Sequence, residues 1–105
     1  MKTTPEMVIV IRQYQEVSDQ QIAGMERYVN GLMLTLSQGQ FDALISLGLQ
    51  IGSTKLGNTA MVRYPKSDIT KAFVRWGKKT GASARRKMEL YRWRGAAPCY
   101  IQPEV

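Results

Sequence analysis

The chain has 105 residues and a formal net charge of +7, so it is long enough for one domain with a buried core. It contains one cysteine and no histidine, which excludes an internal disulfide framework and leaves the usual zinc and iron–sulfur sites without ligands. No stretch approaches the roughly 20 apolar residues of a membrane-spanning helix. We therefore expect a basic globular protein with no metal or other cofactor and no membrane insertion.

Residues 5–15 predict the first helix. Thr4 can serve as its N-cap, Pro5 suits the first turn, and Glu6 lies near the positive end of the helix dipole. The run 8–11 is entirely β-branched, however, and this leaves a short strand as the alternative.

Two capping boxes, each a serine followed three residues later by a glutamine, occur at 18–21 and 37–40. The first opens a helix that we expect to end near Met33. The second opens a helix over 38–51, which Gly52 can end. The apolar residues of this second helix recur at helical spacing, and they are Phe41, Leu44, Ile45, Leu47, Gly48 and Ile51. Such an apolar helix must be surrounded by its neighbours, so we predict that 38–51 is the central core helix.

The second half of the chain predicts shorter elements. We expect a loop at 52–57, a short helix at 58–64 halted by Pro65, and a further helix capped by Ser67. A basic turn at 77–83 then precedes the last helix. That last helix should run over 84–94 and direct Met88, Leu90 and Tyr91 inward.

Four blocks resemble one known family in the same order. They are MERYVNGL at 25–32, SQGQFDALISLGLQIG at 37–52 with LGNTAMVR at 56–63, AFVRWGK at 72–78 and RRKMELY at 85–91. These blocks are similar to segments of phage lysozymes, the endolysins of lambdoid phages.

The resemblance implies an all-α fold, a small lysozyme-like C-terminal lobe of about five helices around 38–51. It implies one domain over 1–105, with a divergent N-terminal segment at 1–17 and an irregular tail at 95–105. Because nothing in the sequence predicts export, the compartment it implies is the host cytoplasm.

Catalysis is not predicted. Glycoside hydrolysis usually needs two carboxyl groups across the scissile bond, and the resemblance implies a Glu-x8-Asp-x5-Thr pattern that this sequence does not contain. We interpret Asp42 and Asp68 as first-turn residues that favour the helix dipole. Glu26 and Glu89 are expected in surface ion pairs. We therefore predict no catalytic residues.

A basic cluster near the C-terminus is the predicted binding face. Trp93, flanked by arginines, is expected to be exposed and able to contact a partner, whereas Trp76 is expected in the core. A solvated face without function is the alternative interpretation of the charges. The predicted binding residues are Arg75, Lys78, Lys79, Arg85, Arg86, Lys87, Arg92, Trp93 and Arg94.

The favoured hypothesis is a non-catalytic, lysozyme-derived phage or prophage protein. It would bind a host or phage protein as an inhibitor or regulator, and it would form a homodimer. The first alternative is a role in cell-wall lysis, either through binding of peptidoglycan or through residual muramidase activity. The partner would then be an anionic glycan. The second alternative is a basic helical regulator that binds nucleic acid.

Overall fold

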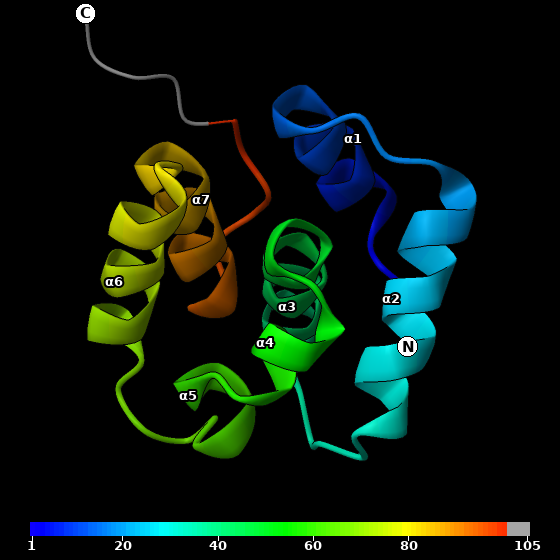
Figure 1. Ribbon diagram of the computed structural model, residues 1–105. Helices are drawn as coiled ribbons and strands as arrows, with labels where there is room; N and C mark the ends of the chain where they lie inside the picture. The colour runs from blue at the N-terminus through cyan, green and yellow to red at the C-terminus, as the bar shows by residue number, and fades with distance from the viewer. Residues whose placement is uncertain (101–105) are drawn as a thin grey trace, which may run out of the picture.

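The computed structural model describes residues 1–100, which form seven helices and no strand (Figure 1). The prediction of an all-α fold is confirmed, and the described residues hold more helices than the five or so expected. No helix in this part of the chain combines the length and the apolar character needed to cross a bilayer. The helices are α1 (Pro5–Tyr14), α2 (Asp19–Gly31), α3 (Gln38–Ile51), α4 (Ser53–Gly57), α5 (Ala60–Arg63), α6 (Thr70–Thr80) and α7 (Ser83–Trp93).

Helix α3 is the centre of the fold, as its sequence predicted. Figure 1 shows it between α1 and α2 on one side and α6 and α7 on the other. Nine of its 14 residues are buried. Its capping box forms, since Ser37 accepts from the Gln40 amide at 3.1 Å and Gln40 Oε1 accepts from the Ser37 amide at 2.9 Å. Gly52, with a φ of +88°, ends the helix in a conformation that favours glycine.

The N-terminal segment is a helix, so the alternative of a strand is excluded. The Thr4 hydroxyl accepts from the Met7 amide at 3.3 Å, and Pro5 occupies the first turn. The β-branched run does not prevent the helix because Met7, Val10 and Ile11 are spaced to face the core, where they are buried. Tertiary packing therefore outweighs the weak local preference for a strand.

Two predicted details between α3 and α6 are wrong. The expected loop at 52–57 contains α4, because fully buried Leu56 anchors a helical turn against Gly48 of α3. Ser67 does not cap α6, which starts at Thr70, and its hydroxyl instead donates to the Tyr64 carbonyl at 2.7 Å.

Helices α6 and α7 form a closely packed pair. A Cβ on Gly77 of α6 would lie 3.2 Å from Ser83 Cα, so a glycine at this position permits the close approach. Gly81, with a φ of +71°, ends α6 and starts the turn into α7. Tyr91 was expected to face inward, but it is exposed and lines a cavity together with residues of α6. Residues 96–100 are irregular, as predicted for the tail, and 101–105 lie outside the described residues.

Candidate binding surface

The nine predicted binding residues separate into two groups. Arg75, Lys78 and Lys79 on α6, Lys87 on α7 and Arg94 directly after it are exposed, as the prediction of a basic face requires. The other four are partly or fully buried, and they are Arg85, Arg86, Arg92 and Trp93. The basic face is therefore smaller than the sequence suggested.

Arg85 and Arg86 belong to a buried ionic cluster, which corrects their assignment to the surface. Glu89 lies between them, with Arg86 NH2 donating to its Oε2 at 2.7 Å and Arg85 Nε 3.5 Å from the same oxygen. The hydroxyl of Ser46 on α3 also donates to Glu89. Arg85 further donates to the Ser46 carbonyl at 2.8 Å and to Gln15 Oε1 at 2.8 Å. These bonds join α7 to α3 and to the end of α1.

Glu89 is fully buried, so its predicted role in a surface ion pair is wrong. Burial raises the pKa of its carboxyl above the ordinary value, and the two arginines act in the opposite direction. Burial also lowers the pKa of Arg85 to about 10, which leaves its guanidinium charged at neutral pH. The cluster thus retains charge inside the protein because its members compensate one another.

A second internal network involves Asp42, which is buried and not simply a first-turn carboxylate. Arg92 donates to its Oδ2 from Nε at 3.0 Å and from NH2 at 2.9 Å. Thr4 donates to Asp42 from its hydroxyl at 2.8 Å and from its amide at 3.2 Å, and Gln38 donates at 2.9 Å. Asp42 thereby connects the start of α1 with the end of α7.

The predictions for the two tryptophans were partly wrong. Trp93 is only 8% exposed and meets Phe73 edge to face at a centroid distance of 6.0 Å, so it is a core residue. Trp76 packs against the core as predicted, but it is only half-buried, and Lys79 Nζ lies 4.8 Å from its ring centroid. The tryptophan available to a ligand is therefore Trp76.

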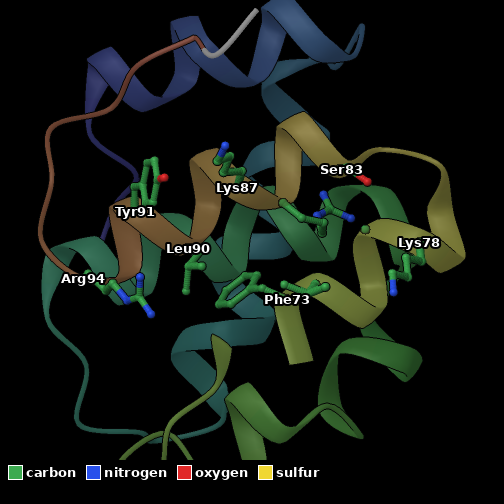
Figure 2. A pocket seen from close by; sticks show the side chains of 10 residues that line it. Phe73, Lys78, Ser83, Lys87, Leu90, Tyr91 and Arg94 are labelled. Atoms are coloured by element: carbon green, nitrogen blue, oxygen red, sulfur yellow. The ribbon is translucent and has the colours of Figure 1, made fainter. Parts of the chain in front are cut away.

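One cavity is a groove of about 340 Å³ between α6 and α7 (Figure 2). From α6 it is lined by Phe73, Val74, Gly77 and Lys78. From α7 and the residue after it, the lining residues are Ser83, Arg86, Lys87, Leu90, Tyr91 and Arg94. We call this cavity the α6/α7 groove. Its apolar walls and cationic edges suit a ligand that is both apolar and anionic.

The second cavity, of about 400 Å³, contains Trp76 together with Asn58, Arg75 and Lys79. An aromatic ring beside amide and charged groups is a surface on which a sugar or a base can stack. The third cavity, of about 530 Å³, lies at the start of α7 and includes Lys78 and Arg85. No aspartate or glutamate lines any of these three cavities.

The remaining described carboxylates have structural or solvent-exposed positions. Glu26 was expected in a surface ion pair, but it instead accepts from the Thr3 amide at 2.7 Å and from its hydroxyl at 2.8 Å. Asp68 is exposed and accepts from Thr70, which lowers the pKa of its carboxyl. Residues 1–100 contain no group of three His, Cys, Asp or Glu side chains able to hold a metal ion.

The sequence prediction missed the apolar half of the groove. Val74 and Tyr91 are among the exposed large apolar residues, and Phe73 and Leu90 form the buried wall beneath them. A signal for this stripe was present, because the α7 lining residues recur at three- and four-residue steps. It was hidden by the expectation that Tyr91 faces the core.

Comparison with protein families matches residues 1–94 to the family described as Phage lysozyme. No curated protein and no solved structure matches the chain. The matched region includes all seven helices, since the last of them, α7, ends at Trp93. The chain therefore belongs to the phage lysozyme family.

Proposed function

We propose that this lysozyme-related phage protein acts by binding a partner protein in the host cytoplasm, as an inhibitor or regulator, and not by cleaving peptidoglycan. The observation that carries the proposal is the composition of its cavities. The three cavities described above are each lined by lysine or arginine, and none of them is lined by a carboxylate. Concave cationic surfaces favour the binding of acidic groups.

Hydrolysis would require a different arrangement of acidic residues. A glycosidase places two carboxyl groups across an open cleft, about 5–9.5 Å apart. Here Asp42 and Glu89 are buried in internal ion pairs, and Glu26 is bonded to the N-terminal segment. Reassigning any of them to catalysis would break one of these internal contacts.

A role in cell-wall lysis through glycan binding is the second candidate. The observation in its favour is the cavity in which half-buried Trp76 lies beside Asn58 and Arg75. Nucleic-acid binding has less support, because Arg85, Arg86 and Trp93 are unavailable at the surface. The burial of Trp93 removes the aromatic residue that was expected to stack on bases.

A turbidity assay on purified peptidoglycan tests the proposal. The 105-residue protein should leave the turbidity unchanged, while an active phage lysozyme should reduce it under the same conditions. Clearing at an ordinary enzymatic rate would refute the proposal. Sedimentation of the protein with the insoluble peptidoglycan, without clearing, would favour the glycan-binding candidate, and Trp76→Ala should then abolish the sedimentation.

The predicted homodimer is a separate part of the proposal. Ile9 on α1 and Met33 after α2 are exposed apolar residues away from the α6/α7 groove. A second copy could cover them without opposing the basic groove. Analytical ultracentrifugation should then show a dimer that Ile9→Ser or Met33→Ser converts to a monomer.

A further inference from the structure

The α6/α7 groove runs along the whole of α7. Its α7 lining residues follow one another at steps of three, one, three, one and three, from Ser83 to Arg94. This is the spacing of a continuous helical stripe. Eleven helical steps correspond to about 16 Å, so the groove is long enough for about three turns of a helix lying beside it.

The groove exposes apolar surface that residues 1–100 do not cover. Val74 is 50% exposed and Tyr91 is 39% exposed, on opposite walls. Figure 2 shows Leu90 and Phe73 between the charged side chains at the centre of the groove. Contiguous exposed apolar side chains with a polar border mark sites at which proteins bind partners.

The edges of the groove are cationic. Lys78, Lys87 and Arg94 lie around the apolar centre (Figure 2). Among residues 1–100, neither lysine forms an ion pair. Arg94 donates to the Thr70 hydroxyl at 2.5 Å, and its charge contributes to the lowered pKa of Asp68 at that end. The groove therefore offers three positive charges around an apolar strip.

We infer that the α6/α7 groove binds an amphipathic helix of a partner protein, with its apolar face on Val74, Leu90 and Tyr91 and acidic residues on its flanks. The inference rests on the proposed function and names the surface and the partner chemistry for it. Apolar contacts hold such a helix at i, i+3, i+4 and i+7 positions, while the flanking carboxylates meet Lys78, Lys87 and Arg94 and fix its orientation.

The same charges disfavour two other occupants. A second copy of the chain carries +7, so two grooves facing each other would bring lysines against lysines. A polynucleotide would satisfy the lysines but would leave the apolar strip of Val74 and Leu90 without an apolar partner. The charge pattern and the apolar strip are both matched by an acidic amphipathic helix.

The test uses a fluorescein-labelled helical peptide of about 12 residues, with leucine every third or fourth position and glutamate on both flanks. Its fluorescence anisotropy should rise to saturation on titration with the whole protein. The double variant Lys78→Glu/Lys87→Glu should weaken binding by about tenfold or more. The variant Val74→Ser/Tyr91→Ser should also weaken it by about tenfold, because it removes apolar contact.

Matched controls distinguish the effect of the groove on binding from the effects of net charge and of exposed apolar residues elsewhere. Lys2→Glu/Lys66→Glu makes the same change in net charge at exposed lysines outside the groove, and it should leave the affinity within about twofold. Tyr64→Ser, at an exposed apolar residue outside the groove, should do the same. A scrambled peptide of the same composition should bind less tightly, because its apolar residues no longer share one face.

Four results would overturn the inference. They are the absence of saturable peptide binding, equal weakening by the groove and control variants, full competition by a single-stranded oligonucleotide, and a dimer lost in Val74→Ser/Tyr91→Ser. Circular dichroism and thermal unfolding confirm that each variant is folded. Clearing of peptidoglycan would refute the proposed function, whereas any of these four results would refute only this assignment.

Discussion

The two faces of α7 carry similar side chains in different surroundings. On the face toward α3, Arg85 and Glu89 are buried and bonded to Ser46. On the face toward the α6/α7 groove, Lys87 and Arg94 are exposed, and Lys87 forms no ion pair among the described residues. Alternation between the faces follows from the helical repeat. One basic segment can therefore supply both the internal connections and the binding charges.

The face of α7 toward α3 should contribute most to the stability of the protein. Glu89→Ala leaves the buried guanidinium groups of Arg85 and Arg86 without their carboxylate, so the free energy of unfolding should fall by about 3–5 kcal/mol. Urea unfolding followed by circular dichroism measures the loss. Glu16→Ala, at an exposed position, is the control and should change stability by less than about 0.5 kcal/mol. A loss from Glu89→Ala no larger than that of the control would show that the buried cluster contributes little.

Arg92 and Arg94 provide a comparison between residues two positions apart. Arg92→Ala removes the charged donor to Asp42, which still accepts from Thr4 and Gln38, so we expect a loss of about 2 kcal/mol. Arg94→Ala, on the groove side, should cost less than about 1 kcal/mol because its side chain is exposed. Thermal unfolding of both variants measures the difference. Equal losses would contradict the assignment of the two arginines to different roles.

The elements that sequence alone could predict depend on local signals. The capping boxes at 18–21 and 37–40 act within a few residues, and the apolar spacing of 38–51 requires burial whatever the neighbours are. Both were correct. Thr4 as the cap of the first helix was correct for the same reason. Local chemistry and periodicity thus fixed the starts of three helices and the identity of the core helix.

The burial of the arginines could not be predicted in this way. Arg85, Arg86 and Glu89 have the three- and four-residue spacing of ordinary surface ion pairs. Their burial depends on Ser46, 39 residues before Arg85, and on Gln15, 70 residues before it. Contacts at these separations leave no local pattern. For the same reason, the sequence overestimated the basic face.

The pH dependence of stability tests the environment of Glu89. Because burial raises the pKa of Glu89, the folded state retains its proton at pH values where the unfolded state has released it. Between the ordinary pKa of 4.5 and the higher pKa of the folded state, this carboxyl therefore makes the free energy of unfolding fall as the pH rises. Glu89→Gln removes the titration. The stability of the wild type relative to Glu89→Gln should consequently decrease over this range in urea unfolding at stepped pH.

The opposite slope would mean that the arginines outweigh burial and keep the carboxyl ionised. The control is Asp68→Asn, since Asp68 is exposed and its pKa is lowered. The contribution of Asp68 to the free energy of unfolding is present at pH values above its ordinary pKa and is lost as the pH falls. Its pH dependence therefore has the opposite sign from that of Glu89.

The smallest expected effect on stability is that of Lys87→Glu on the groove side. Lys87 is exposed and forms no ion pair within residues 1–100, so the free energy of unfolding should change by no more than about 0.5 kcal/mol. The same substitution should weaken binding of the acidic helical peptide by severalfold. A residue that affects binding without affecting stability is distinct from Glu89, whose loss unfolds the protein more readily. If Lys87→Glu lowered stability as much as Glu89→Ala, the two faces of α7 would not differ in role, and the groove would be part of the scaffold.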